Sequence, residues 1–202
     1  SRAQKINGKI CRIGDITMKK IMIDMDDVIC GGGFLALVNE FLGTAYREED
    51  IKTYYLQDII PEEKKNEWKE FFGSKNLYDY TYILPDAYEV MEKLSKKYEL
   101  YIVTAYIFKD DENKSAEHLK NKFNYLIKTF PFIKPQQYVF TTNKEIINCD
   151  IKIDDRAANL KGKAEKKLLF SAYHNKNIPD EELKKDGLIR VNNWKEVEKI
   201  LL

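Results

Sequence analysis

Cysteine is scarce in this sequence, and no two cysteines are spaced as a pair. Only Cys11, Cys30 and Cys149 occur among the 202 residues, and none belongs to a Cys-x-x-Cys motif. An odd number of widely spaced cysteines argues against a disulfide framework and against a zinc site. Free thiols fit a reducing compartment, so we expect a cytoplasmic protein.

Long apolar runs and an excess of either charge are also missing. No stretch approaches the roughly 18 consecutive apolar residues that a membrane-spanning helix needs. Lys and Arg number 34 against 33 Asp and Glu, which gives a formal net charge of +1. Nucleic-acid-binding proteins usually carry a basic excess. We therefore expect neither a membrane nor a nucleic acid as partner, while a small anionic ligand remains compatible with a few local charges.

The first 17 residues lack the apolar centre of a signal peptide. Met18-Lys19-Lys20, directly before an apolar run, resembles a natural start. We therefore expect residues 1–17 to be a leader or a disordered extension. The remaining length, in a chain with 44% hydrophobic residues, suffices for one good-sized domain with a small insertion.

What the sequence does contain is a short apolar run that ends in carboxylates. Residues 21–29 read Ile-Met-Ile-Asp-Met-Asp-Asp-Val-Ile, which places Asp24, Asp26 and Asp27 where a buried strand would emerge. In an open α/β sheet, ligands bind at the carboxyl ends of the strands. Three acids crowded at such a point repel one another unless a cation lies among them. This segment therefore predicts a fold class and a metal site together.

Apolar patterns along the rest of the chain predict an α/β fold with a parallel sheet flanked by helices. We expect further strands at 100–103, 138–140, 151–153, 167–170 and 188–191, and helices at 34–42, 61–73, 85–94, 114–130 and 194–202. From residue 84 onward strands alternate with helices, which is typical of a parallel sheet. Residues 31–84 break this alternation. We therefore expect a core of residues 18–30 and 85–202, with residues 31–84 as a small helical cap inserted after the first strand.

The predicted helix at 114–130 carries apolar side chains at helical spacing. Those expected to face the core are Leu119, Phe123, Leu126 and Ile127. His118 is expected on the solvated side of this helix. His174, further along the chain, is expected to be a structural hydrogen-bonding residue.

Polar side chains follow the predicted strands at one edge of the sheet. Asp24 follows the first strand, Thr104 the second and Lys144, after a short gap, the third. Asp154 and Asp155 end the fourth strand. Carboxylates, a hydroxyl and one lysine are the groups that a magnesium-assisted phosphoryl transfer requires. In this interpretation Asp24 and Asp155 hold Mg²⁺, which prefers oxygen ligands.

Each remaining group has a role in such a reaction. Asp24 can attack phosphorus and form an aspartyl-phosphate. Asp26, two residues along, can protonate the leaving alcohol and then deprotonate water. Thr104 and backbone amides near it, that of Ala105 among them, bind the phosphoryl oxygens, and Lys144 neutralises charge on the transferring group. Acids at strand ends are common when taken singly, so the combination is what makes the prediction specific.

These residues resemble the motifs of the haloacid dehalogenase superfamily. Residues 24–28, Asp-Met-Asp-Asp-Val, resemble its first motif, Asp-x-Asp-x-Thr/Val. Residues 102–104, Ile-Val-Thr, are similar to the second motif, Lys144 to the third, and residues 153–155, Ile-Asp-Asp, to the fourth. Their order and rough spacing agree over residues 20–200. The resemblance implies a Rossmann-like core and a Mg²⁺ cofactor.

Further segments resemble the 5'(3')-deoxyribonucleotidase branch of that superfamily. The separation between Lys144 and the Asp154-Asp155 pair is the same in that branch. Residues 170–175 read Phe-Ser-Ala-Tyr-His-Asn, similar to the branch's Phe-x-Ala-x-His-Asn, and Trp194 lies in the last predicted helix. The resemblance implies a small phosphorylated substrate, with a nucleotide as the expected choice.

The resemblance also implies a role for each matching position. It implies that Asp24 is the nucleophile and that Asp26 is the general acid/base and lends its backbone carbonyl to the metal. Asp155 would be the third metal ligand. Thr104 and Lys144 would bind phosphate.

Behind these groups, the resemblance implies a supporting position for Asp154. It also implies that the cap covers the substrate and excludes water.

One departure from the branch concerns the substrate. The branch usually reads Asp-Met-Asp-Gly-Val-Leu-Ala-Asp-Phe, whereas this chain has Asp27 in place of the glycine and Gly31-Gly32-Gly33 in the Asp-Phe region. The aromatic side chain that contacts the base is therefore absent or displaced to Phe34. The chemistry is left intact by this change, and base recognition is what it affects.

The sequence supports three hypotheses. The first is a Mg²⁺-dependent phosphomonoesterase, 5'-nucleotidase-like, that acts on nucleoside monophosphates. The second keeps the fold and takes a sugar phosphate or another small metabolite. The third is a non-enzymatic module that binds a phosphorylated ligand, although such a module has no chemical reason to keep both Asp24 and Asp26. The oligomeric state is open, with a dimer among the alternatives.

Overall fold

The computed structural model of the chain describes residues 4–6, 9–11, 18–51, 56–108 and 111–202. Strands β1 (Gln4–Ile6) and β2 (Lys9–Cys11) pair with each other in antiparallel fashion. The other residues of the predicted leader lie outside the described residues, so the nature of residues 1–17 stays a prediction. No helix in the described ranges is long and apolar enough to cross a membrane.

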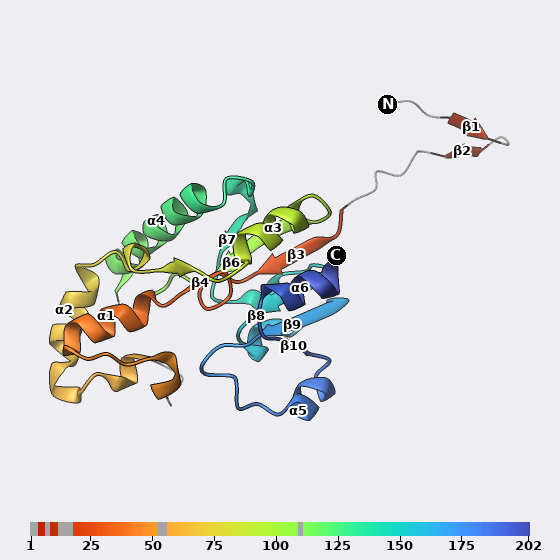
Figure 1. The fold of residues 1–202 in the computed structure, drawn as a ribbon. Coiled ribbons are helices and arrows are strands. Elements are labelled where there is room, and N and C mark those ends of the chain that lie inside the picture. The colour runs from red at the N-terminus through yellow and green to blue at the C-terminus, as the bar shows by residue number, and fades with distance from the viewer. Residues whose placement is uncertain (1–3, 7–8, 12–17, 52–55, 109–110) are drawn as a thin grey trace.

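A six-stranded parallel sheet forms the centre of the molecule (Figure 1). In spatial order its strands are β10 (Ile189–Val191), β9 (Lys166–Phe170), β8 (Ile151–Asp154), β3 (Lys20–Ile23), β6 (Glu99–Thr104) and β7 (Tyr138–Phe140). Every neighbouring pair runs parallel. The central strands read as continuous apolar runs because both faces of a parallel sheet are covered. The predicted α/β class with a parallel sheet is confirmed.

The order of the strands reverses at β3. From β3 the chain moves outward through β6 to β7, then returns to the other side of β3 and continues through β8 and β9 to β10. In a doubly wound sheet such a switch point opens a crevice at the carboxyl ends of the central strands. The ends of β3, β6 and β8 therefore meet where ligands usually bind.

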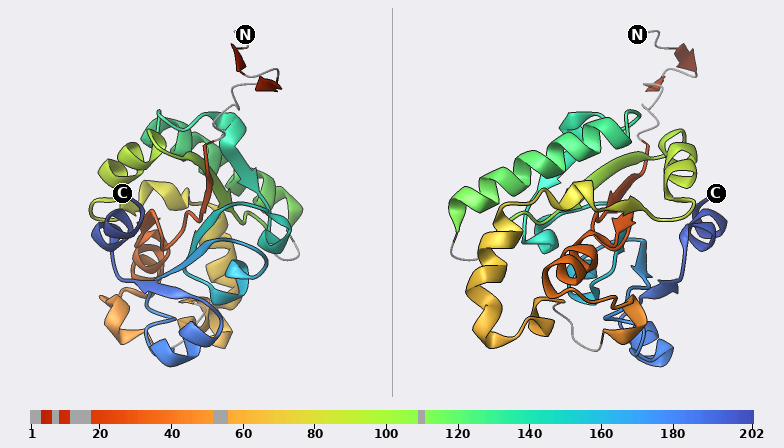
Figure 2. Two further views of the ribbon diagram at one scale, coloured as in Figure 1. Left: turned by 90° about the vertical axis from the view of Figure 1, so that its right-hand side faces the viewer. Right: turned by 60° about the vertical axis from the view of Figure 1, so that its left-hand side comes forward.

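Helices cover both faces of the sheet. They are α3 (Ala87–Ser95), α4 (Glu112–Thr129), α5 (Asp180–Lys185) and α6 (Trp194–Leu201), with short 3₁₀ helices η5 (Pro135–Gln137), η6 (Lys144–Ile146) and η7 (Ala157–Leu160). Buried residues of α3, α4 and α6 share one hydrophobic cluster with Leu168. Leu183 of α5 packs with Leu169 in another. Successive strand side chains point to opposite faces, so α5 lies across the sheet from α4 (Figure 2).

The side of α4 that faces inward differs from the prediction. Phe123 and Ile127, expected in the core, are 36% and 43% exposed, whereas Ser115, Lys122 and Leu126 are buried. The helix begins after Asp111, whose side chain accepts a hydrogen bond from the Lys114 backbone N–H at 2.9 Å. The expectation was wrong because it assumed that every polar side chain on the helix points to solvent.

Between β3 and α3 the chain forms a mostly helical segment. Its elements are β4 (Cys30–Gly31), α1 (Gly33–Leu42), η1 (Glu48–Asp50), η2 (Leu56–Ile59), η3 (Glu62–Lys64), α2 (Lys65–Gly73), η4 (Leu77–Asp79) and β5 (Tyr82–Ile83). Leu37, Val38, Ile60 and Trp68 form a separate small core between them. Figure 1 shows α1 and α2 at the opposite end of the molecule from α5 and α6.

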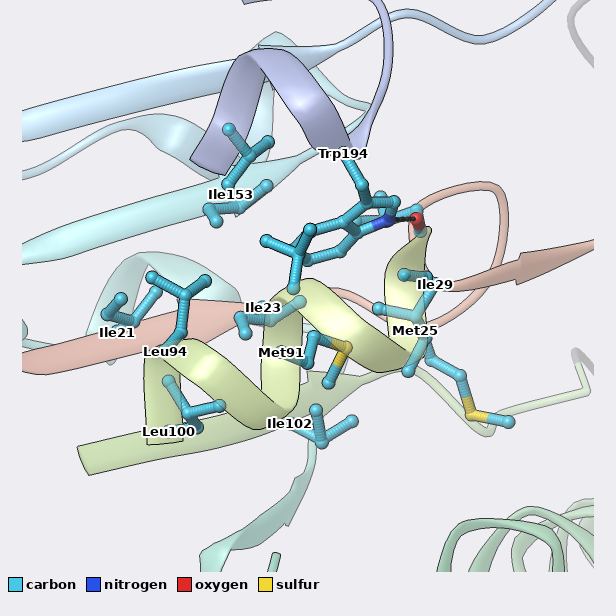
Figure 3. Packing of buried hydrophobic residues seen from close by; sticks show 14 of the residues in the cluster. Ile21, Ile23, Met25, Ile29, Met91, Leu94, Leu100, Ile102, Ile153 and Trp194 are labelled. Carbon is cyan, nitrogen blue, oxygen red and sulfur yellow. Dashed lines mark hydrogen bonds between the residues drawn. The ribbon is translucent and has the colours of Figure 1, made fainter. Parts of the chain in front are cut away.

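Trp194 forms a hydrogen bond that connects the last helix to the loop after β3 (Figure 3). Its side chain is fully buried in the main cluster, close to Ile23 and Met91. Its indole Nε1 donates a hydrogen bond to the backbone carbonyl of Val28 at 2.7 Å. Because Val28 lies two residues after Asp26, this bond ties the end of the chain to the acidic segment.

We expect Trp194→Phe to lower the free energy of unfolding by about 2 kcal/mol, since it leaves a buried carbonyl without a donor and removes packing. Urea denaturation followed by circular dichroism measures this loss. Trp68→Phe is the matched control, because Trp68 is buried but its indole makes no hydrogen bond to the described residues. Equal losses in the two variants would contradict a contribution from the Val28 bond.

Candidate active site

The carboxyl edge of the sheet brings together the residues that the sequence placed there. Asp24 directly follows β3, Thr104 ends β6, and Asp154 ends β8 with Asp155 behind it. Lys144 begins η6, in the connection that leads from β7 back to β8. All five are buried. Uncompensated burial of so many charges would be prohibitive, so each must be held by opposite charge or hydrogen bonds.

Lys144 bridges two of the carboxylates. Its Nζ lies 2.7 Å from Oδ2 of Asp24 and 2.8 Å from Oδ2 of Asp154. The other oxygen of Asp24 accepts a hydrogen bond from the Met25 backbone N–H at 2.6 Å. Burial raises the pKa of Asp24 to about 6, against the opposing charge of Lys144, and the charge of Asp154 adds to the rise. These contacts fix the orientation of the Asp24 carboxyl, and its pKa lies close to neutral pH.

Asp154 stands behind Asp24. Its Oδ1 accepts hydrogen bonds at 2.9 Å from the backbone N–H of Arg156 and from Nδ2 of Asn159. Because its Oδ2 is taken by Lys144, both oxygens are occupied by protein donors. Asp154 therefore serves best to orient the ammonium group of Lys144 towards Asp24.

The segment from Phe170 to Asn175 holds Asp155 by side chain and backbone. Nε2 of His174 lies 2.6 Å from Oδ2 of Asp155. The Asn175 side-chain amide donates to the backbone carbonyls of Asp155 and Phe170, both at 2.7 Å. His174 thus forms the hydrogen bond that was expected of it, and its purely structural role stays a prediction. These contacts fix the direction in which the Asp155 carboxylate points.

A cation fits this arrangement. Oxygens of Asp24, Asp154 and Asp155 lie within 4.8 Å of one another. Burial raises the pKa of Asp155, and the charge of Asp24 adds to the rise. A hard cation that prefers oxygen donors would relieve this repulsion, and Mg²⁺ is such a cation. Asp154 accepts hydrogen bonds from three protein groups and is fully buried, whereas Asp24 and Asp155 are slightly more exposed, so these two side chains would hold the ion.

Lys122 is the residue of this site that sequence reasoning missed. It comes from the middle of α4, is fully buried, and reaches Oδ2 of Asp26 at 2.6 Å. It also donates to the Thr104 hydroxyl at 2.5 Å and to the Ala105 carbonyl at 2.6 Å. The available signal was its spacing, because Lys122 lies seven residues after Ser115 and four before Leu126 on one helical face.

Lys122 also sets the charge of Asp26. Burial opposes ionisation of Asp26, but the charge and hydrogen bond of Lys122 outweigh it, so the pKa of Asp26 is lowered. The Tyr78 hydroxyl donates a further hydrogen bond to Oδ1 of Asp26 at 3.3 Å. Asp24 and Asp26, two residues apart, therefore have pKa values shifted in opposite directions, which is typical of paired groups with different chemical tasks.

Asp27, which departs from the family pattern, occupies a backbone position suited to glycine. Its φ is 59°, in the left-handed region that Asp tolerates better than most residues. Its backbone N–H donates to the Cys30 carbonyl at 2.7 Å. Burial and the neighbouring charges of Asp155 and Asp26 raise the pKa of Asp27 well above its usual range. A glycine would adopt this backbone conformation without strain.

A cavity of about 380 Å³ opens beside these acids. Asp26, Asp27 and Asp155 line one part of it, and Phe34 and Phe108 line another. Phe34 lies on the wall of this cavity, and its contact with a substrate stays a prediction.

Aromatic rings from two segments of the chain meet at the cavity wall. The Phe72 ring lies 5.1 Å from that of Phe34 and 5.5 Å from that of Phe108, measured between centroids. The space next to the carboxylates is thus walled by apolar faces that suit a planar ring.

The chain is similar to known nucleotidases over most of its length. Residues 18–202 match the family described as 5' nucleotidase, deoxy (pyrimidine), cytosolic type C. The 5'(3')-deoxyribonucleotidase of Bacillus subtilis is 32% identical over 188 residues, covering 92% of this chain and all of the relative. A Staphylococcus aureus relative is 32% identical over 189 residues, covering 93% of this chain and 97% of its own.

Solved structures share the fold. A haloacid dehalogenase-like hydrolase from Streptococcus pneumoniae superposes with a TM-score of 0.55 at 15% identity, covering 92% of this chain and 99% of its own. The predicted Rossmann-like core of the haloacid dehalogenase type is thereby confirmed.

Protons and Mg²⁺ should compete for Asp24. Because the metal-free carboxyl has a pKa of about 6, it is mostly ionised at pH 7 and mostly protonated at pH 5. Mg²⁺ needs the carboxylate, so its affinity should fall by about tenfold between pH 7 and pH 5, as isothermal titration calorimetry would show. In Asp24→Asn the affinity should be weaker and this pH dependence reduced. An affinity that is constant across this range in the unmodified protein would contradict the expectation.

Replacing Lys122 should release Asp26 from its charged partner. We expect Lys122→Met to raise the pKa of the Asp26 carboxyl in the metal-free protein, because the group loses its ammonium neighbour while it stays partly buried. Carbon-13 NMR titration of the side-chain carboxyls measures this directly. Lys120→Met, which removes an exposed lysine of the same helix, should leave that pKa unchanged. A Lys122→Met protein with an unaltered Asp26 titration would disprove the assignment.

Proposed function

The chain belongs to the cytosolic type C 5'-nucleotidase family, deoxy and pyrimidine type, and we propose that it is a Mg²⁺-dependent phosphomonoesterase acting on nucleoside monophosphates. The observation that carries this proposal is the pair Asp24 and Asp26 at the sheet edge, where Asp26 lines the aromatic-walled cavity. The two acids are two residues apart, each is held by its own buried lysine, and the cavity next to them can take a planar base.

The first step is attack on phosphorus by Asp24. A carboxylate oxygen of Asp24 forms a bond to phosphorus while the bond from phosphorus to the sugar oxygen breaks. Asp26 gives its proton to that oxygen, and the free nucleoside leaves. Lys144, fixed beside Asp24, balances the charge that builds up on the phosphoryl oxygens.

The second step regenerates the enzyme. Asp26, now a carboxylate, takes a proton from water, and the water oxygen attacks phosphorus while the bond to Asp24 breaks. Phosphate is released. Lys122 favours the ionised form of Asp26, which suits this base role. A phosphate group arriving in the cavity adds negative charge beside Asp26 and raises its pKa, which favours the protonated form needed first.

Mg²⁺ would be held by the carboxylates of Asp24 and Asp155 and by the backbone carbonyl of Asp26. When bound, it would neutralise phosphoryl oxygens and keep them close to Asp24. Thr104 and the backbone near Ala105 lie at the same edge and would complete the phosphate site.

The segment of residues 31–84 would act as the cap. It supplies Phe34 and Phe72 to the wall of the cavity, which Asp155 of the core also lines. We expect the base to lie against these rings and the phosphate to point towards Asp24. This assignment places base recognition on Phe34, despite the glycines that precede it.

Asp24→Asn should abolish phosphate release from nucleoside monophosphates, by about 10³-fold or more, because an amide cannot serve as the nucleophile. A colorimetric phosphate assay over a panel of nucleotides and sugar phosphates, with and without Mg²⁺, measures this. Asp186→Asn, an exposed change near α5, is the control and should retain full activity.

Two results would contradict the proposal. One is a metal-replete protein that hydrolyses neither the nucleotides nor a generic aryl phosphate. The other is a panel in which sugar phosphates are hydrolysed and no nucleotide is. That result would leave the phosphatase mechanism standing and would contradict the assignment of a nucleotide as substrate.

A further inference from the structure

His118 does not lie on the solvated side of α4, as its sequence neighbourhood suggested. Its ring stacks on Tyr78, with centroids 5.7 Å apart, and meets Phe108 edge-on at 5.0 Å. It lies four residues before Lys122, so both side chains project from the same face of the helix. The expectation was wrong because it treated a polar residue of this helix as exposed, which is also why Lys122 was missed.

The ring of His118 forms part of the cavity wall. No described residue exchanges a hydrogen bond with its nitrogens, and no buried side-chain nitrogen or oxygen in the described part of the chain lacks a partner. The His118 nitrogens are therefore not sealed from solvent, and the residue lines both this cavity and a smaller one beside it. A polar group that is open to a substrate cavity and otherwise surrounded by aromatic rings is suited to fix a ligand's orientation.

The position of His118 specifies which part of a ligand it would meet. A row of contacts runs from Asp26 through the Tyr78 hydroxyl to His118, and from there through Phe108 to Phe72. Asp26 marks the place of the phosphoester oxygen, and the phenylalanines mark the place of the base. In a nucleoside monophosphate the sugar joins these two groups, so His118 lies at the level of the sugar.

The imidazole is also in a suitable state for this contact. Burial, together with the nearby charge of Lys122, lowers the pKa of His118 to about 4, against the opposing effect of Asp26. A neutral imidazole has one N–H donor and one acceptor nitrogen, and can therefore bind a hydroxyl from either side. A charged imidazole would instead compete with Lys122 for Asp26.

We infer that His118 is a specificity-determining residue that hydrogen-bonds a hydroxyl group of the substrate's sugar. This inference rests on the proposed nucleotidase function and extends it to the part of the substrate that His118 recognises. A hydrogen bond of this kind discriminates between substrates, because a substrate without the hydroxyl leaves the imidazole without a partner in the bound complex.

The test compares His118→Phe with the unmodified protein on matched substrates. The substrates are a ribonucleoside monophosphate, its 2'-deoxy and 2',3'-dideoxy forms, and p-nitrophenyl phosphate, which has no sugar. The unmodified protein should lose about tenfold in kcat/KM when the recognised hydroxyl is removed. His118→Phe, which keeps a ring against Tyr78 and Phe108, should treat the three nucleotides alike and hydrolyse p-nitrophenyl phosphate normally.

A second variant separates recognition from packing. His118→Gln keeps a donor and an acceptor near the position of Nε2 and should restore part of the discrimination, although it packs less well than Phe. Thermal melts by circular dichroism report on folding of both variants.

Three outcomes would overturn the inference. The unmodified protein could hydrolyse all three nucleotides equally, or His118→Phe could lose activity equally on nucleotides and on p-nitrophenyl phosphate. The third outcome is hydrolysis of p-nitrophenyl phosphate without hydrolysis of any nucleotide, which removes the substrate on which the inference rests. By contrast, an unmodified protein that hydrolyses none of the four compounds contradicts the proposed function itself and the inference with it.

Discussion

The site depends on neutralising acids that the fold forces together. Asp24, Asp154 and Asp155 meet because β3 and β8 are neighbours at the switch point of the sheet. Buried carboxylates at such distances would repel one another, at a cost of several kcal/mol, without a cation among them. Lys144 supplies that cation from η6, while Lys122 does the same for Asp26 from α4. Asp24 and Asp154 thus share Lys144, Asp26 is paired with Lys122, and Asp155 is held by His174.

This division of charge gives the two key acids different environments. Asp24 is buried against Lys144 and has a raised pKa, whereas Asp26 is half-exposed against Lys122 and has a lowered one. A nucleophile and a proton carrier need such unlike settings, although they are only two residues apart in the sequence. The chain leaves the strand after Ile23, and Asp26 then meets Lys122 while Asp24 meets Lys144. The proposed chemistry therefore follows from how the strand end is placed between a loop lysine and a helix lysine.

Much of the fold and the acidic half of the site could be predicted from the sequence. The strands were predictable because buried parallel strands are short apolar runs, and Asp24, Thr104 and Asp154 were predictable because strand ends collect at one edge. Lys122 and His118 were not predictable in the same way. A polar residue on an amphipathic helix is normally exposed, so the spacing of Lys122 from Leu126 was a weak signal, and the neighbouring elements show that this face of α4 turns towards Asp26.

The central claim is that Asp24 attacks while Asp26 moves the proton, and the phosphorylated intermediate tests it most directly. A single turnover with a nucleoside monophosphate and Mg²⁺, quenched in acid and followed by peptide mass spectrometry, locates the transferred phosphoryl group. The account predicts that the group is found on Asp24. A phosphoryl group on Asp26, or hydrolysis at full rate with no phosphorylated peptide at any time point, would contradict it.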